Sequence, residues 1–393
     1  MAVGHTSPGP VVLATGGTGG HVFPAEALAG ELEARGLPFA LVTDSRGRQW
    51  QGALSRRPIH YIHSASPTGS LRKRLTAMFA LAFGLFDAWR ALGRIGPSAV
   101  VGFGGYASVP TLIAARLRRL PAMLHEQNAV LGKANRLVLG GAARVATSFA
   151  RTQYLADDDR RASLVGNPVR EPVRLLRTSP YRAPGEGRVI DLLVFGGSQG
   201  AASFSQVIPE AVLSLPSALR ARVRLVQQCR PEDIERVRRR YADLGIPAEL
   251  LTYIEDMPVK LADAHLVIGR AGASTIAELT AAGRPAILIP YAAATDDHQT
   301  ANAREMVKAG GARAIQEAGF TPRVLARQIE AMAADPGALD NAAARALSVG
   351  RPHAARDLAD LAERIAQGAG PALVGSVLSP RVAAEAPGDA VPA

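Results

Sequence analysis

Two glycine-rich turns, each between an apolar strand-like run and a helical pattern, constrain the fold of this chain more than any other feature. The first is Gly-Gly-Thr-Gly-Gly at residues 16–20, after Val11–Thr15, and the second is Gly-Gly-Ser-Gln-Gly at residues 196–200, after Val189–Phe195. Short apolar runs alternate with longer helical segments after each turn, which is typical of parallel α/β sheets. The 393 residues are also too many for one hydrophobic core. The sequence therefore predicts two α/β domains.

The pattern breaks at Gly166–Pro172, which predicts the boundary between the domains. We expect an N-terminal domain over residues 8–167 and a C-terminal domain over 168–350. A terminal helix over 351–368 is expected to pack back on the first domain, and the Ala-, Pro- and Gly-rich residues 369–393 to form a disordered tail. The fold class is α/β, with two Rossmann-like domains whose parallel sheets face each other across a cleft.

The charge of the chain is unevenly distributed. Residues 1–170 hold 20 Lys and Arg against 9 Asp and Glu, whereas residues 171–393 hold 25 of each. The first half therefore needs an anionic partner: nucleic acid, a membrane surface or an acidic substrate. Nucleic acid is disfavoured, because aromatic residues are only 5% and no recognition motif accompanies the arginines. The single cysteine, Cys229, allows no internal disulfide, and no Cys/His cluster predicts a metal site.

A glycine turn at the start of a helix exposes backbone N–H groups and binds phosphate. The first turn is not a P-loop, since no Lys-Ser/Thr follows, and Val22 stands where a dinucleotide fingerprint needs its third glycine. Asp44 follows the second predicted strand, where NAD sites have an acidic residue that binds the ribose, so an NAD(P)-dependent oxidoreductase remains an alternative. A tight turn that binds no ligand is the other alternative for this motif. A third loop, residues 269–279, is either a Thr275–Glu278 capping box or a diphosphate site with Glu278 on a ribose diol.

Seven motifs occur in the order of one known family: residues 15–29, 102–110, 125–128, 166–170, 195–201, 270–279 and 297–303. On these motifs the chain resembles the UDP-N-acetylglucosamine–N-acetylmuramyl-(pentapeptide) pyrophosphoryl-undecaprenol N-acetylglucosamine transferases of bacterial peptidoglycan synthesis. The resemblance implies the GT-B glycosyltransferase fold. It also implies inverting transfer of GlcNAc from UDP-GlcNAc to the C4 hydroxyl of MurNAc in undecaprenyl-diphospho-MurNAc-pentapeptide (lipid I), which gives the β-1,4-linked lipid II. Another GT-B enzyme, with a soluble acceptor or a UDP-GlcNAc 2-epimerase activity, is the alternative.

The resemblance also implies where the enzyme acts and what it binds. It would be a peripheral protein at the cytoplasmic face of the inner membrane, with an anionic membrane surface and a complex of cell-wall synthesis enzymes as partners, and with no cofactor, metal or nucleic acid. Implied donor residues are Thr18, Gly19, Gly20, Asn128, Arg170, Ser198, Ile254, Ala273, Ser274, Thr275, Ile276, Ala277, Glu278 and Gln299. Implied contacts to the acceptor diphosphate are Gly16, Gly17, Gly104, Gly105 and Tyr106.

Two residues are candidates for the base that deprotonates the acceptor hydroxyl. His21 directly follows the first glycine turn and titrates near neutral pH, although a structural loop histidine would fit the same place. Glu126 is the second candidate. One motif departs from the family, which often has His-x-x-Gly where this chain has Gln227–Arg230, so no role of that histidine transfers here.

Leu71–Arg90 reads as one amphipathic helix with two apolar stripes. We expect one stripe to serve the domain core, namely Leu71, Leu75, Met78, Ala82, Leu85 and Trp89. The second stripe, Phe79, Phe83 and Phe86, follows the basic residues Arg72, Lys73 and Arg74, and is expected to enter the membrane interface. A helix buried on two sides is the alternative.

Overall fold

The structure is a computed structural model. It describes residues 9–16, 19–49, 54, 58–65, 70–197 and 200–368, without the side chains of 48, 49 and 71–75. The expected tail over 369–393 therefore lies outside the described residues.

The N-terminal domain is built on a seven-stranded sheet in the order β3-β2-β1-β4-β5-β6-β7, in which all neighbours are parallel. Val11 pairs with Phe39 on one side and with Ala99 on the other, so β1 is central and the strand order reverses there. In open parallel sheets, ligands bind beyond the carboxyl ends of the strands at such a point. The strands are β1 (Val11–Ala14), β2 (Phe39–Thr43), β3 (Ile59–Tyr61), β4 (Ala99–Gly102), β5 (Ala122–Glu126), β6 (Arg144–Thr147) and β7 (Ala162–Leu164).

The C-terminal domain repeats this plan with a six-stranded parallel sheet in the order β10-β9-β8-β11-β12-β13. Its reversal point lies at β8, directly before the second glycine turn. The strands are β8 (Ile190–Phe195), β9 (Val223–Gln228), β10 (Ala248–Leu251), β11 (Leu266–Gly269), β12 (Ala286–Leu288) and β13 (Ala312–Ala314). Two α/β domains with parallel sheets are thus confirmed.

Helices cover both faces of each sheet, because alternate strand residues point to opposite sides and both sides are apolar. Val11 and Leu13 pack toward one helical layer and Val12 and Ala14 toward the other. The helices are α1 (Gly19–Ala34), α2 (Leu71–Ile95), α3 (Val109–Leu117), α4 (Lys133–Val138), α5 (Glu171–Leu175), α6 (Ala202–Leu213), α7 (Ser217–Arg220), α8 (Ile234–Asp243), α9 (Met257–Asp263), α10 (Ala273–Ala282), α11 (His298–Ala309), α12 (Pro322–Ala333), α13 (Pro336–Val349) and α14 (Ala354–Ala366).

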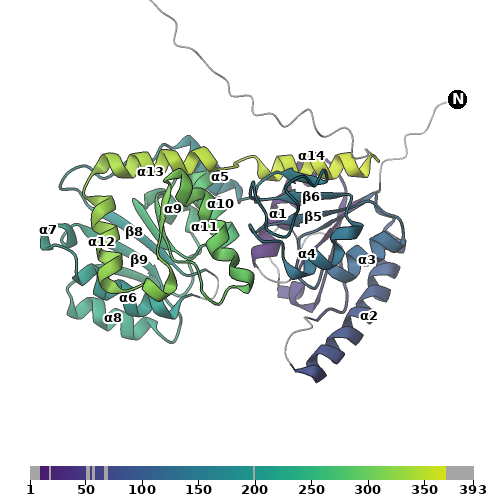
Figure 1. The fold of residues 1–393 in the computed structure, drawn as a ribbon, viewed down its shortest axis with the longest axis horizontal. Coiled ribbons are helices and arrows are strands. Elements are labelled where there is room, and N and C mark those ends of the chain that lie inside the picture. Colours follow the sequence, from purple (N-terminus) through teal and green to yellow (C-terminus); the bar gives the residue numbers. More distant parts are fainter. Residues whose placement is uncertain are drawn as a thin grey trace, which may run out of the picture.

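The chain crosses between the domains twice. It leaves the N-terminal domain near Gly166 and returns after α13, so that α14 lies on the N-terminal lobe while α13 lies on the other (Figure 1). Leu358 and Ile365 of α14 join the core that contains Leu13, and Arg35, directly after α1, donates a hydrogen bond to Asp360 at 2.7 Å. The last helix is therefore part of the N-terminal fold.

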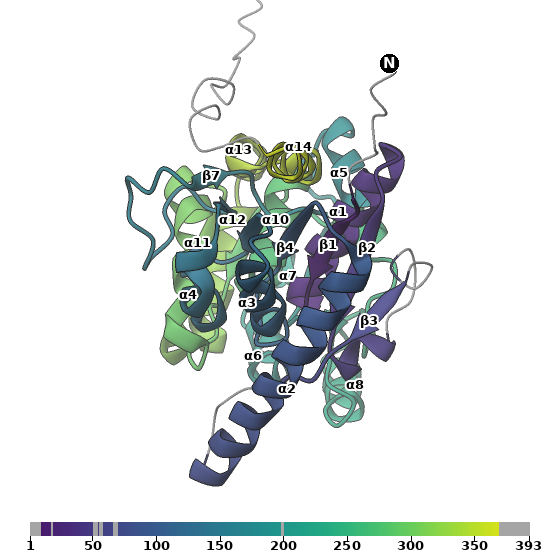
Figure 2. The ribbon, with the colours of Figure 1, turned by 90° about the vertical axis from the view of Figure 1, so that its right-hand side faces the viewer.

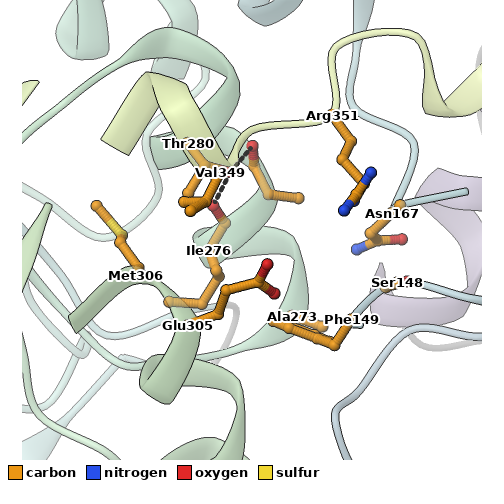
Figure 3. A pocket seen from close by; sticks show the side chains of 12 residues that line it. Ser148, Phe149, Asn167, Ala273, Ile276, Thr280, Glu305, Met306, Val349 and Arg351 are labelled. Carbon is orange, nitrogen blue, oxygen red and sulfur yellow. Dashed lines mark hydrogen bonds between the residues drawn. The ribbon is translucent and has the colours of Figure 1, made fainter. Parts of the chain in front are cut away.

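The two crossings touch each other beside a small cavity of about 30 Å³, whose other walls include α10 and α11. Gly166 has φ +94°, and a Cβ there would lie 2.7 Å from the Cβ of Arg351, so only glycine fits. Asn167, Glu305 and Arg351 lie on the walls of this cavity (Figure 3). The carboxamide of Asn167 is buried and has no protein partner in the described part of the chain. A volume of this size fits one or two water molecules.

Helix α2 projects from the N-terminal lobe (Figure 2), and the predicted core stripe on it is wrong. Met78 is 62% exposed and Trp89 45% exposed, whereas the buried positions are Ala77, Gly84, Ala88, Ala91 and Leu92. Small residues allow close approach: a Cβ at Gly84 would lie 1.9 Å from the carbonyl oxygen of His63. Both apolar stripes therefore stay mostly at the surface, and among the described side chains of the predicted core stripe only Leu85 packs against the core. Across the described residues, we find no helix with the length and hydrophobicity needed to span a bilayer.

Candidate active site

A cleft of about 1030 Å³ lies between the two domains and brings together most of the predicted donor residues. Residues of both domains line it, including His21 from the start of α1 and Gln299 from the start of α11. The predicted donor residues on its walls are Gly19, Gly20, Asn128, Arg170, Ile254, Ala273, Ser274, Thr275, Glu278 and Gln299. Gly17, Thr18 and Ser198 lie outside the described residues.

Two predicted donor residues do not line this cleft. Ile276 is buried in the core of the C-terminal domain, and both Ile276 and Ala277 line the small cavity between the crossings instead. Successive residues of an α-helix lie about 100° apart around its axis, so Ile276 and Ala277 face another side of α10 than Thr275 and Glu278. A contiguous motif on a helix cannot present all of its side chains to one ligand.

Helix α10 presents its N-terminus to the cleft. The N-cap residue is Gly272, which has no side chain that could accept a hydrogen bond. Thr275 is therefore inside the helix instead of at its N-cap, and the Thr275–Glu278 capping box does not form. The first backbone N–H groups of the helix have no partner within the helix, and the helix dipole favours negative charge there. Ser274 and Thr275 line the cleft beside these groups. The arrangement suits a phosphate or diphosphate.

Arg170 and Glu278 form an ion pair across this end of the cleft, with 3.2 Å between Arg170 Nη2 and Glu278 Oε1. Burial raises the pKa of Glu278, and the charge of Arg170 opposes that rise. The guanidinium also lies 5.6 Å from the centre of the Phe23 ring, and its buried Nε has no partner in the described structure. The side chain as a whole is 34% exposed and lines the cleft, so its terminal N–H groups can donate to an anionic ligand.

Gln299 joins two loops of the C-terminal domain beside the start of α10. Its Oε1 accepts hydrogen bonds from Ala271 N at 3.2 Å and from Tyr291 N at 2.9 Å. The carbonyl end of the side chain is therefore engaged by backbone. Its NH₂ group remains to donate to a ligand hydroxyl in the cleft.

His21 packs against the glycine turn that follows β4. A Cβ at Gly104 would lie 3.4 Å from its Nε2, and one at Gly105 would lie 3.6 Å from its Cε1. Both glycines have positive φ, of 85° and 71°, which allows the turn to pass this close to the imidazole. Burial, and secondly the charge of Arg46, lower the pKa of His21 to about 4. The imidazole is neutral at physiological pH and can accept a proton.

Of the residues predicted to contact the acceptor diphosphate, Gly16, Gly104, Gly105 and Tyr106 are described by the structure and do not line this cleft. Tyr106 packs partly buried against the core beneath α3, and the Gly104–Gly105 turn contacts His21. Gly16 lies near Ala107, with 3.7 Å between the Ala107 Cβ and the position of a Cβ at Gly16.

Glu126 is buried at the end of β5 and is occupied by four hydrogen bonds. Oε1 accepts from the backbone N of Asn128 at 3.0 Å and from its Nδ2 at 3.3 Å. Oε2 accepts from Gly132 N at 2.9 Å and from Asn135 Nδ2 at 2.8 Å. Burial raises its pKa and these bonds oppose that rise. The carboxylate organises the loop that carries Asn128, so its geometry favours His21 as the proton acceptor.

Several residues of the site carried no sequence signal of their own. Asn135 occurs in a plain helical segment, and Asn302 lies within the 297–303 motif but at no position that predicts a contact. Gln228, in the segment that departs from the family pattern, accepts from Gly196 N at 3.2 Å and lines the cleft. Only the fold brings these side chains to the site.

Family models match both halves of the chain. The glycosyltransferase family 28 N-terminal domain matches residues 11–147, and the C-terminal domain of the same family matches residues 191–365. The chain belongs to glycosyltransferase family 28. The enzyme is therefore a glycosyltransferase, and this decides against the NAD(P)-dependent oxidoreductase.

Individual relatives agree with this membership. A Novosphingobium aromaticivorans protein named UDP-N-acetylglucosamine--N-acetylmuramyl-(pentapeptide) pyrophosphoryl-undecaprenol N-acetylglucosamine transferase is 52% identical over 90% of this chain and 91% of its own. The crystal structure of Acinetobacter baumannii MurG is 29% identical, with a TM-score of 0.72 over 90% of this chain and 99% of that one. A putative UDP-N-acetylglucosamine 2-epimerase from Listeria monocytogenes has a TM-score of 0.65 over 91% and 97% of the two chains, but at 15% identity it shares the fold alone. The expected GT-B fold is confirmed.

Proposed function

We propose that this enzyme transfers GlcNAc from UDP-GlcNAc to the C4 hydroxyl of MurNAc in lipid I and so forms lipid II. The observation that carries the proposal is the 52% identity to a transferase of that name over 90% of the chain. The cleft between the domains supports it, because predicted donor residues and the candidate base His21 line the same cavity.

The C-terminal domain would hold most of the donor. The N-terminal amides of α10 and the guanidinium of Arg170 stabilise the diphosphate, and the carboxylate of Glu278 accepts hydrogen bonds from the ribose diol. Ile254, which is nearly buried beside the cleft, would pack against the uracil. Gln299 donates its NH₂ group to a sugar hydroxyl.

Inversion follows from one direct displacement at the anomeric carbon. The acceptor oxygen attacks from the side opposite the diphosphate, His21 takes the proton of that hydroxyl, and UDP leaves with the electron pair of the broken C–O bond. Negative charge grows on the diphosphate as the bond breaks. The α10 amides and Arg170 are placed to stabilise this charge more strongly in the transition state than in the ground state.

Helix α2 would bring the enzyme to the lipid substrate at the cytoplasmic face of the inner membrane. Phe79 is 67% exposed and Phe83 is 64% exposed, and Met78, Phe86 and Trp89 extend the same apolar surface. An apolar surface of this kind along a projecting helix suits insertion between lipid headgroups. Arg72, Lys73 and Arg74, whose side chains lie outside the described residues, would each add about 1 kcal/mol at an anionic surface. An assembly with other cell-wall enzymes fits the same location.

The test is transfer of labelled GlcNAc from UDP-GlcNAc to a lipid-linked MurNAc-pentapeptide diphosphate in detergent micelles. We expect labelled lipid II with and without EDTA. Absence of transfer would refute the function, and loss of transfer with EDTA would refute the role of Arg170 and α10 as sufficient stabilisers of the leaving group.

A further inference from the structure

Asn302 lies at the centre of a polar contact between the two domains. It is on α11 of the C-terminal domain, and its side chain is fully buried. Its Oδ1 accepts a hydrogen bond from Ala129 N at 2.7 Å, and its Nδ2 donates to Asn128 Oδ1 and to Ala271 O, both at 3.1 Å. Two of these three partners belong to the N-terminal domain. One carboxamide therefore joins the loop after β5 to the loop after β11.

On the side of the site proposed to bind UDP-GlcNAc, this contact leads to the turn that begins α10. Ala271 directly precedes Gly272, the N-cap of the helix whose amides are proposed to hold the diphosphate. The backbone N of Ala271 is held by Gln299, and its carbonyl oxygen by Asn302. Both polar groups of this residue are thus fixed by side chains of α11.

On the side of the site proposed to bind lipid I, the contact leads to the turn beside His21. Asn128 bonds Glu126, and Glu126 bonds Asn135, as described above. The Nδ2 of Asn135 lies 3.5 Å from the position of a Cβ at Gly104, in the turn that packs on the imidazole. A series of hydrogen bonds therefore runs from Asn135, which packs on the turn beside the proposed base, to the proposed diphosphate site, with Asn302 as its step across the domain boundary.

Burial distinguishes this contact from the other polar contacts between the domains. The Arg136–Asp296 pair also joins them, but its side chains keep 28% and 25% of their exposure, and water screens such pairs. Removal of Asn302 would leave Ala129 N and Ala271 O buried without partners, which is the costly case for hydrogen bonds. No other side chain offers the same combination of one acceptor and two donors at this length.

We infer that Asn302 is a positioning residue for the transfer reaction and sets the relative placement of the acceptor and donor halves of the site. Asn302 is not among the described residues that line the cleft, so it acts through Asn128 and Ala271. Binding of UDP depends mainly on the C-terminal domain, whereas attack requires both domains in register. The inference rests on the proposed function, and it predicts loss of turnover with retention of nucleotide binding.

The experiment uses Asn302→Asp in the full chain. Aspartate has nearly the same shape and still accepts from Ala129 N, but it places a carboxylate oxygen against Asn128 Oδ1 and Ala271 O. We expect kcat to fall on the order of 10- to 100-fold, since displacements near 1 Å have effects of this size. The dissociation constant of UDP, measured by calorimetry, should change less than about threefold. The calorimetric stoichiometry counts folded enzyme, so kcat is obtained per folded molecule even if the variant is less stable.

Three further variants make the result specific. Arg304→Ala, an exposed change on the same helix, should leave kcat unchanged, and Arg136→Ala, which breaks the exposed pair between the domains, should lower it less than about threefold. Asn128→Ala combined with Asn302→Asp should lose less activity than the product of the two single losses, because the two side chains share a hydrogen bond. A kcat within threefold of wild type for Asn302→Asp, losses that multiply in the double variant, or loss of UDP binding equal to the loss of kcat would each overturn the inference. An inactive wild type would instead refute the proposed function.

Discussion

The guanidinium of Arg170 and the carboxylate of Glu278 lie 3.2 Å apart, one at the crossing between the domains and the other on α10 of the C-terminal domain. Each residue is proposed to bind a different part of UDP, the diphosphate and the ribose. The ion pair therefore holds both side chains in the cleft, and each charge is balanced by the other. We expect nucleotide binding to need only a small rearrangement, in which each group exchanges part of this contact for a ligand contact.

Glu278→Gln should raise the KM for UDP-GlcNAc by on the order of tenfold, because an amide offers only one oxygen to the ribose diol. The decisive measurement compares UDP-GlcNAc with its 2′-deoxyribose analogue. Wild type should prefer the natural donor, and Glu278→Gln should lose most of that preference. An equal preference in both enzymes would mean that Glu278 does not contact the ribose.

His21→Ala should lower kcat on the order of 10²- to 10⁴-fold and leave UDP affinity nearly unchanged, since general-base catalysis contributes about this much. The base acts in its neutral form, and the pKa of His21 is about 4. The wild-type rate should therefore be constant from about pH 5.5 upward and fall as the pH approaches 4. An acid limb near pH 6.5, or one that persists in His21→Ala, would assign the base to another group.

His125 should make the stability of the fold depend on pH between 6.5 and 4. Its Nε2 bonds Gly166 O at 3.0 Å and its Nδ1 accepts from Gln127 Nε2 at 3.0 Å, so the buried ring is held neutral. Burial lowers its pKa from 6.5 to about 4, with a smaller lowering by His21. Between these values the unfolded chain binds more protons than the native one, so stability is full above pH 6.5 and falls with decreasing pH, by about 1.4 kcal/mol per unit at most.

Urea unfolding at pH 7, 6 and 5 measures this effect, with His125→Asn as the comparison. The variant should be less stable at pH 7 but should lose less stability on acidification than wild type. Parallel pH curves for the two proteins would show that His125 is not responsible.

Phe79→Glu combined with Phe83→Glu should abolish flotation of the enzyme with vesicles that contain anionic lipid. Both side chains lie on the exposed surface of α2, away from the cleft, so transfer to a soluble acceptor analogue should persist. Val189→Glu adds a charge at a position 47% exposed on the C-terminal domain and should float like wild type. Flotation of the double variant at wild-type levels would exclude α2 as the membrane contact.

The sequence was informative where backbone geometry decides the outcome. Glycine turns after β1 and β8 predicted two parallel sheets and the cleft between them. Prediction from the sequence failed for α2, because periodicity identifies apolar stripes but does not tell which one packs inward. There the deciding factor was the absence of a side chain at Gly84, which lets the helix approach the His63 carbonyl.

The polar interior of the site was equally hidden from sequence. Glu126 has the residue type of a catalytic base, and only its four hydrogen bonds identify it as the organiser of a loop. Asn302 acquires its contacts from a residue 173 positions away. Contacts of this kind depend on how the domains meet, which no local pattern records.

The return of α14 to the N-terminal domain has a consequence for how the chain folds during synthesis. Leu358, Leu361 and Ile365 complete a core that otherwise consists of residues before Gly166. While the ribosome makes the second domain, one side of the first sheet remains partly uncovered. The first domain to emerge is therefore the last to be finished, and translation must pass Ala366 before its apolar layer closes.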